Sequence, residues 1–512
     1  MNVFELVAFI LYFIFVLGIG LFFFFKSKGG GEKEYFLGGR NMNGWVSALS
    51  AGASDMSAWV LMGLPGAIAL YGMGRIWISI GLLIGTVLAW VFIAPKLRRY
   101  AILANDSITI PEFLSNRFLA KSPVLRIACA IIFVVGYCLY TASSIYACGT
   151  IFRSLLGGNV SIVVGMAIMS VIIILYTLLG GFKAVSWTDF FQGLLMLAAL
   201  MVLPIIAVFM INGNFVTPAG NEQYFSFLSS GTFDWASVSD IISGFGWGLG
   251  YFGMPHILVR YMAVKSEKEM KKSQIIGSVW TFLILAMASV LGLVAYSFLG
   301  SELTDANRSM VFVNITRKIF SYGGLALIGG VLISAIVAAS MSTADSQLLA
   351  SSSAFVSDLY KPLSKKQTSD KKMMWISRIG VFVIALIAFF IAYFVSLSPK
   401  AEGIMDLVSA AWAIFGASFG PVIILALFWK RFNYAGAVSA IISGFVVSVL
   451  WMVLFNLDYH SFTSVIYYTN VYEIVPGFIV SLIVGIIVSL CTRKPSDETV
   501  NLFDAVKNYK EN

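Results

Sequence analysis

The sequence contains few charged residues, few histidines and few cysteines. Only 12% of its 512 residues are charged and 59% are hydrophobic, whereas a soluble domain carries about 25% charged residues. This deficit indicates a polytopic membrane protein and argues against one large soluble core. The net charge of +9 comes from basic residues in short loops between apolar runs. That pattern is typical of membrane topology rather than of nucleic-acid binding.

Sequence patterns for catalysis are also missing. The four cysteines, Cys129, Cys138, Cys148 and Cys491, lie in or beside apolar segments and form no CxxC pair. Neither a disulfide framework nor a zinc site is therefore predicted. The sequence shows no metal-binding cluster, no nucleophile–histidine–acid set and no phosphate-binding loop. It predicts neither an enzyme nor a protein with a resident cofactor.

Long apolar runs dominate the chain. A helix that crosses a membrane needs about 20 apolar residues. We predict thirteen such spans, at about 3–25, 45–71, 76–95, 124–152, 160–179, 189–211, 237–259, 274–299, 322–357, 374–396, 404–428, 435–455 and 472–491. The expected fold class is all-α integral membrane protein. Residues 1–492 would form a single transmembrane domain and residues 493–512 a short, solvated cytoplasmic tail.

The basic residues are unevenly distributed between the two sides of these spans. Of the 34 lysines and arginines, 28 fall on one side. Loops rich in lysine and arginine stay in the cytoplasm. The distribution predicts an N-terminus outside and a C-terminus inside, as an odd number of spans requires.

Two spans are interrupted. The second contains SAGASDMSAW, with Asp55 at its centre, and the seventh contains SGFGWGLGYFGMPHI. Glycine and proline weaken a helix, and a charge at membrane depth marks a functional site. Paired broken helices five spans apart predict two inverted repeats, at about 45–211 and 237–428, followed by extra helices at about 435–491. The alternative is that the glycines only permit close helix packing.

An oxygen-rich patch lies in the ninth span, in AASMSTADSQLL. Ser342 and Thr343 are adjacent, and the carbonyl of Ala339 lies one turn earlier on the same face. Hard cations prefer oxygen ligands, so these groups and an unwound segment at 53–56 form a plausible sodium site. The alternative is that the hydroxyls bond back to their own helix.

Five segments resemble the sodium:solute symporter family. They are YTLLGGFKAVSWTDFFQGLLM (176–196), TIPEFLSNRF (109–118), SMSTADSQLL (340–349), GGRNMNGWVSALSAGASDMSAW (38–59) and GWGLGYFGMPHILVRYMA (246–263). The last two are similar to the sodium/proline symporters of that family. The resemblance implies a LeuT-like fold of five-plus-five inverted repeats with flanking helices. It also implies import of L-proline with sodium by alternating access.

The resemblance further implies roles for individual residues. Sodium would be bound by the carbonyls of Ala53, Met56 and Ala339 and the hydroxyls of Ser342 and Thr343, with Asp55 and Asp189, just before the sixth span, in support. Arg40 would act in coupling. The substrate pocket would contain Ser57, Tyr140, Trp247, Tyr251 and Pro255. Sodium is then a co-transported ligand rather than a cofactor.

The residues leave several other functions open. The solute could be another small amino acid, a carboxylate resembling pantothenate, or a sugar. A membrane sensor or channel and a membrane enzyme are the alternatives from other classes. We expect a multi-pass protein of a bacterial cytoplasmic membrane that has lipid as a partner, binds no nucleic acid and functions as a monomer.

Overall fold

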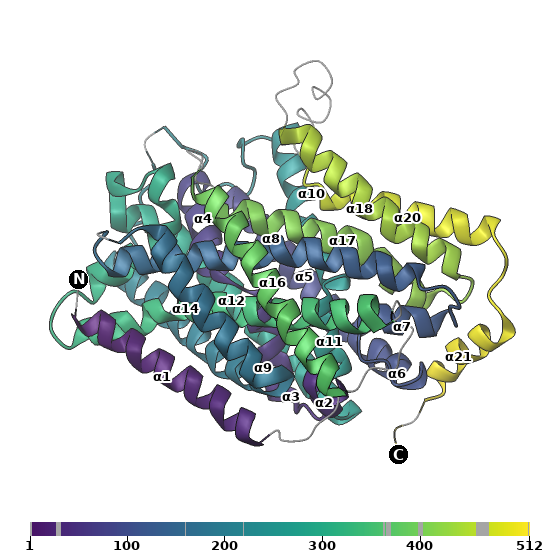
Figure 1. Cartoon of the computed structure of the whole chain (residues 1–512). Coiled ribbons are helices and arrows are strands. Elements are labelled where there is room, and N and C mark those ends of the chain that lie inside the picture. Colours follow the sequence, from purple (N-terminus) through teal and green to yellow (C-terminus); the bar gives the residue numbers. More distant parts are fainter. Residues whose placement is uncertain are drawn as a thin grey trace.

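A computed structural model describes residues 3–26, 32–158, 160–218, 220–361, 364, 370–397, 403–456, 471–509 and 511. The described chain is a bundle of helices (Figure 1). Among these residues, ten helices are long and apolar enough to cross a membrane. The bent pair Gly44–Asp55 and Trp59–Tyr71 makes an eleventh span. The prediction of an all-helical membrane protein is therefore confirmed, and the thirteen-span count stays a prediction.

The helices follow the predicted spans closely. In the first half they are α1 (Val3–Lys26), α2 (Glu32–Leu37), α3 (Gly44–Asp55), η2 (Trp59–Gly63), α4 (Leu64–Tyr71), α5 (Ile76–Leu88), η4 (Ala89–Ile93), α6 (Ala94–Leu103), α7 (Ile110–Arg117), α8 (Val124–Leu155) and α9 (Ile162–Met210). In the second half they are α10 (Trp235–Leu249), η5 (Gly250–Phe252), α11 (Pro255–Met262), α12 (Glu267–Leu299), α13 (Val311–Ile319), α14 (Leu325–Ser353), η8 (Ala354–Tyr360), α16 (Asp370–Ser396), α17 (Gly403–Phe428), α18 (Tyr434–Asn456), α20 (Ile474–Cys491) and α21 (Asp497–Lys507).

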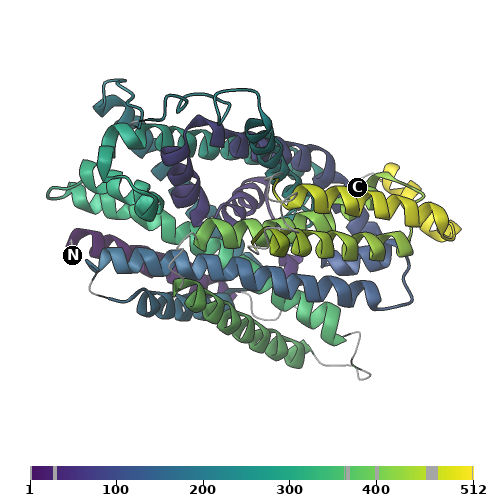
Figure 2. The same ribbon diagram turned by 90° about the horizontal axis from the view of Figure 1, so that it is seen from above.

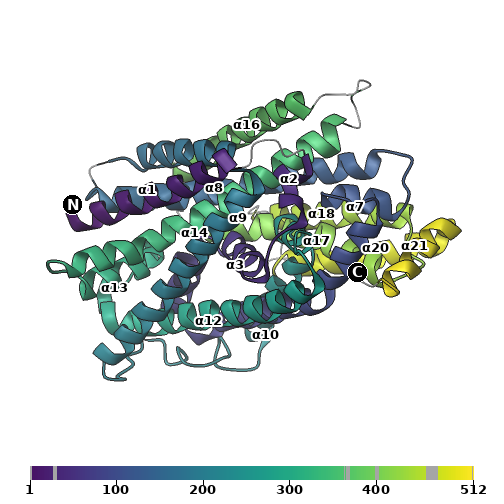
Figure 3. The same ribbon diagram turned by 90° about the horizontal axis from the view of Figure 1, so that it is seen from below.

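The packing of the bundle relates its two halves. Helix α12 packs along α3 and α4, and α5 packs along α10. Helix α8 packs against α17, and α9 packs against α14. Each broken span thus contacts a helix of the other half. Figure 1 shows α1 at one edge of the bundle and the pair α18 and α20 at the other, and the views from above and below agree (Figures 2 and 3).

Glycines bring α5 and α10 into backbone contact. A Cβ atom on Gly81 would lie 2.1 Å from the carbonyl oxygen of Gly244, and one on Gly85 would lie 2.2 Å from that of Gly248. Gly244 and Gly248, which precede the break in the seventh span, therefore lie at a close helix contact. This is the role that the alternative interpretation gave to the glycines of this span. The span is nevertheless broken, because α10 ends at Leu249 and α11 begins at Pro255.

Two predicted boundaries are wrong. The predicted spans 160–179 and 189–211 meet within α9 at a kink at Gly181, where φ is 59°, so that the second of them begins at Gly181 and not at 189. Asp189 therefore lies inside the helix Gly181–Met210 and not just before it. Glycine permits this because it adopts positive φ without a Cβ clash.

The C-terminal tail is also not simply solvated. It forms α21, whose Phe503 is buried and packs edge-on against Tyr100 of α6 at 6.3 Å between ring centroids. Beyond it, Glu511 accepts hydrogen bonds from Arg98 and from the backbone N–H of Glu267. The sequence showed the charge of this tail but not its apolar face, which buries Thr499, Phe503 and Val506.

We expect Gly81→Ala to destabilise the protein. The new methyl group would meet the backbone of α10, and overpacking of this kind costs about 1–3 kcal/mol. Thermal unfolding of the detergent-solubilised protein, followed by tryptophan fluorescence, should show a lower midpoint. Gly18→Ala is the matched control, because a Cβ atom there would meet nothing within 4 Å. Equal midpoints for the two variants would contradict the packing described.

Candidate functional site

The first broken span unwinds directly after Asp55. Helix α3 ends there, and the cap residue Met56 has φ −85° and ψ 76°. Its N–H still donates to the carbonyl of Gly52 at 2.9 Å, and the chain then bends by 62° into η2 and α4. Residues 56–58 thus interrupt the span between two helical halves.

The second broken span contains a tighter interruption. After α10, the short 3-10 turn η5 leads to Gly253, and Pro255 takes the first turn of α11, where a missing N–H costs nothing. The indole Nε1 of Trp412, from α17, donates to the carbonyl of Trp247 at 2.7 Å. A Cβ on Gly250 would lie 2.0 Å from the same nitrogen, so only glycine fits there.

Three of the predicted sodium ligands meet between α3 and α14. The Ser342 hydroxyl donates to the carbonyl of Ala53 at 2.7 Å and lies 3.0 Å from that of Ala339. Met56 and Thr343 follow Ala53 and Ser342 closely in the sequence, and both are fully buried. The Thr343 hydroxyl has no hydrogen-bond partner among the described residues. The patch therefore combines converging oxygens with one buried hydroxyl that is available to a ligand.

Asp55 lies beside the same cluster and is only 1% exposed. The Tyr251 hydroxyl donates to one carboxylate oxygen of Asp55, and the other has no partner among the described residues. The carbonyl of Asp55 accepts from the Tyr140 hydroxyl at 2.9 Å and from the indole of Trp59 at 3.3 Å. A buried carboxylate thus has one oxygen without a donor, an arrangement that favours a bound cation.

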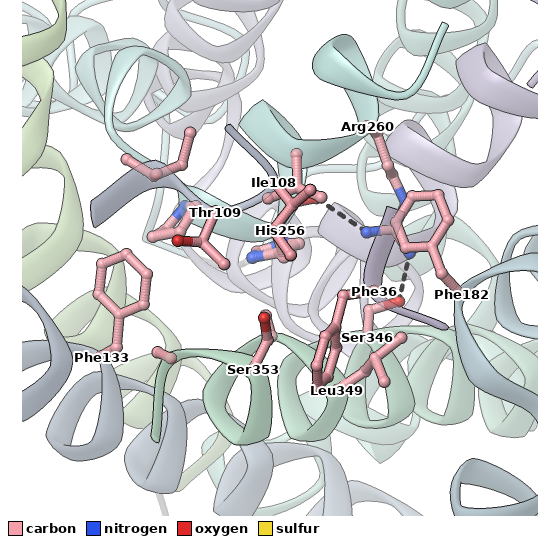
Figure 4. A pocket seen from close by; sticks show the side chains of 15 residues that line it. Phe36, Ile108, Thr109, Phe133, Phe182, His256, Arg260, Ser346, Leu349 and Ser353 are labelled. Carbon is pink, nitrogen blue, oxygen red and sulfur yellow. Dashed lines mark hydrogen bonds between the residues drawn. The ribbon is translucent and has the colours of Figure 1, made fainter. Parts of the chain in front are cut away.

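The predicted substrate residues are divided between two cavities and the buried interior. The first, which we call the α10 cavity, has a volume of about 340 Å³ and includes Trp247. The second, the α11 cavity, has a volume of about 30 Å³ and includes Pro255 (Figure 4). Ser57, Tyr140 and Tyr251 are buried at the breaks. The structure therefore places one predicted residue at each cavity and three in the buried region.

A buried ion pair connects α9 with α11. Arg260 donates to Asp189 at 2.8 Å. It also donates to the hydroxyl of Ser346 at 2.5 Å (Figure 4). The hydroxyl of Ser50 also donates to Asp189, at 2.7 Å. Arg260 lies in the last turn of α11 and is only 2% exposed. The sequence did not reveal this ion pair, because its partner carboxylate comes from a distant part of the chain.

Arg40 joins both broken spans on the side of the α11 cavity. Its guanidinium donates to the carbonyl of Met262, at the end of α11, at 2.7 Å. It also bonds the carbonyl of Ser107 and, at 2.8 Å, the carboxylate of Asp106. Burial alone would raise the pKa of Asp106, but hydrogen bonds from Lys33 and Arg40 outweigh it and hold this pKa below its usual range. Asp106 is therefore ionised at neutral pH.

The chain resembles known transporters over nearly its whole length. The sequence model of the sodium:solute symporter family matches residues 35–444. The osmoregulated proline transporter OpuE of Bacillus subtilis is 40% identical over 511 residues, 99% of each chain. A sodium/proline symporter of Staphylococcus aureus is 40% identical over 490 residues, 94% of this chain and 92% of its own. Among solved structures, a substrate-bound, outward-open Na⁺-coupled sialic acid symporter superposes with a TM-score of 0.75 at 22% identity, covering 96% of this chain and 99% of its own.

We expect Arg260→Ala to destabilise the protein strongly. Removing one partner of a buried ion pair leaves an uncompensated charge and costs about 3–5 kcal/mol. The double variant Arg260→Ala/Asp189→Asn should recover part of this loss, because it also removes the carboxylate charge. Thermal unfolding in detergent measures both, with Arg153→Ala, an exposed arginine, as the control. Equal stability of Arg260→Ala and the control would contradict the pair described.

Proposed function

Because the chain belongs to the sodium:solute symporter family, we propose that it is a sodium-coupled secondary active symporter that imports L-proline by alternating access. The family makes it a multi-pass plasma-membrane transporter rather than an enzyme. One observation carries the proposal: the oxygen cluster of Ala53, Ala339 and Ser342 forms at the first helix break, where the buried carboxylate of Asp55 also contacts Tyr251 of the second break. The names of the two curated relatives support proline as the solute.

In this proposal sodium binds to the carbonyls of Ala53, Met56 and Ala339 and to the hydroxyls of Ser342 and Thr343. The Ser342 hydroxyl now directs its proton to the carbonyl of Ala53. A cation in the cluster would be bound by these same oxygens, and the Ser342 proton would turn away. Neutral oxygens suit an ion that must also leave. Asp55 and Asp189 support the site with negative charge without serving as its main ligands.

Proline is a zwitterion with an apolar ring, and the predicted pocket supplies groups for each part. The N-terminus of α11, which begins at Pro255, would present the positive end of its helix dipole to the carboxylate. Trp247 and Tyr251 lie one turn apart at the second break, so they can cover the ring and the ammonium group, with a cation–π gain of about 0.5–2 kcal/mol. Ser57 and Tyr140 complete the pocket from the first break and from α8.

Arg40 would couple the two breaks during transport. Its hydrogen bonds tie the segment before α3 to the end of α11 and to the α6–α7 loop. Opening the α11 cavity would separate these elements. We propose that release of solute to the cytoplasm therefore requires the Arg40 contacts to break.

We further propose thirteen spans, with the N-terminus outside and the C-terminus inside. Two candidates add to the eleven described above: the apolar helix Ile162–Leu175 and the interrupted segment α10–η5–α11. The exchange of packing partners between the two halves supports inverted repeats at about 45–211 and 237–428. We also propose a monomeric functional unit in contact with lipid, which the many exposed apolar side chains on the long helices suit.

The native cysteines provide a test of this topology. Cys491 is exposed at the end of α20, whereas Cys129, Cys138 and Cys148 are buried. A membrane-impermeant thiol reagent should label the wild-type protein in inverted vesicles and leave it unlabelled in right-side-out vesicles. Cys491→Ser is the control that assigns the signal. Labelling only from the outside would contradict the proposed orientation.

The function is tested by uptake of labelled L-proline into proteoliposomes under an inward sodium gradient, with potassium as the control cation. One sodium ion entering against 100 mV gains about 2.3 kcal/mol, and a tenfold gradient adds about 1.4 kcal/mol. Together they could support accumulation of a neutral zwitterion by roughly 500-fold. Sodium-independent equilibration would contradict symport. Failure with proline alone would shift the search to the other small solutes named above.

We expect Asp55→Asn to raise the sodium concentration for half-maximal uptake by at least about tenfold, which is 1.4 kcal/mol of lost cation stabilisation. Its effect on the amount of folded protein should be small by comparison, because the amide can still accept from Tyr251. Measuring uptake against sodium concentration, normalised to protein in the vesicles, gives this value. Unchanged sodium dependence would exclude Asp55 from the sodium site.

A further inference from the structure

Trp247 is covered from the side of the α10 cavity by a residue that lies two positions before α20. The ring of Tyr472 stacks on the indole of Trp247, with 5.0 Å between ring centroids and an interplanar angle of 25°. Both residues line the α10 cavity, whose volume is about 340 Å³, yet Trp247 is only 6% exposed. The tyrosine ring therefore separates most of the indole from the open cavity.

Tyr472 also connects the two helices that border the cavity. Its hydroxyl donates to the carbonyl of Ser409, in α17, at 2.7 Å. Its backbone N–H donates to the hydroxyl of Ser243, in α10, at 3.0 Å. If α10 and α17 moved apart, one of these two bonds would have to break.

The start of α20 is held firmly in this position. The indole of Trp451, in α18, donates to the carbonyl of Val471 at 3.0 Å. Next to Tyr472, Ile474 lies so close to α17 that a Cβ on Gly416 would be 2.5 Å from its side chain. The adjacent surface of α10 is equally close, since a Cβ on Gly246 would be 2.6 Å from Val475. The backbone is thus fixed, and the tyrosine side chain is the part that could swing.

We propose that Tyr472 is the lid that closes the solute site against the α10 cavity. In this position the ring covers Trp247, the hydroxyl holds α17 and the backbone N–H holds α10; rotation of the side chain uncovers the indole and releases α17. The lid comes from the segment just before α20, which lies outside the two five-helix repeats, so a part of the chain beyond the repeats takes part in transport. The inference rests on the proposed function, because it takes Trp247 as part of the solute site.

A thiol-accessibility experiment tests the lid without using proline. In a Cys491→Ser background, Ser57→Cys reports on the buried region between the cavities, and Ala58→Cys is a second reporter for the same segment. Reaction with an impermeant methanethiosulfonate is timed from the α10 side. Loss of the stack and the hydrogen bond in Tyr472→Ala should speed the reaction about 10–100-fold. Tyr472→Phe keeps the ring and should speed it about 2–10-fold.

Two controls separate a lid from a merely structural residue. Tyr322→Ala changes a tyrosine that is 84% exposed and should leave the rate unchanged. Ser353→Cys, in the α11 cavity, should react from the opposite side at the same rate with or without Tyr472→Ala. An unchanged rate at both reporters in Tyr472→Ala, or an equal rise at Ser353→Cys, would overturn the proposal. If the wild type fails to take up proline, the proposed solute is wrong, but the accessibility result still decides on the lid.

Discussion

The structure depends on one constraint: backbone polar groups that a broken helix exposes at membrane depth must be bonded within the protein. The carbonyls at the two breaks are satisfied by donors from other helices. Tyr140 of α8 reaches Asp55, Ser342 of α14 reaches Ala53, and Trp412 of α17 reaches Trp247. Because each donor comes from a different helix, the two breaks fix where α8, α14 and α17 must lie. The same bonds bring together the groups proposed to bind sodium and solute.

The two sides of the breaks are held closed by different chemistry. On the side of the α11 cavity, charged groups dominate, with Arg40 bonded to Asp106 and Arg260 bonded to Asp189. On the side of the α10 cavity, aromatic rings pack in sequence from Tyr472 over Trp247 to Trp59. Aromatic packing depends little on salt concentration, whereas dissolved salt weakens ion pairs that lie near the protein surface. Opening of the two sides should therefore respond differently to ionic strength.

Much of this arrangement could be predicted from the sequence, because long apolar runs define spans and glycine and proline define the breaks. The proposed sodium cluster was predicted from Ser342 and Thr343, whose adjacency is visible along the chain, and from the resemblance to the symporter family. The ion pair of Arg260 with Asp189 was not predicted, because the two residues are 71 positions apart. Tyr472 was missed for the same reason: nothing in its neighbourhood indicates that it stacks on Trp247. Contacts between distant segments carry no local pattern, and the kinked Gly181 also lies against such a segment, since a Cβ there would be 3.0 Å from the ring of Tyr35.

The last described residue, Glu511, bridges α6 and α12, because it bonds both Arg98 and the backbone of Glu267. Arg98 in turn donates to the carbonyls of Val264 and Lys265, just beyond α11. This end of the described chain is thus one of the connections that hold the segment just beyond α11. An affinity tag or fluorescent protein joined here would lie next to the contacts of Glu511 with Arg98 and Glu267. A fusion at this terminus would therefore itself disturb those contacts.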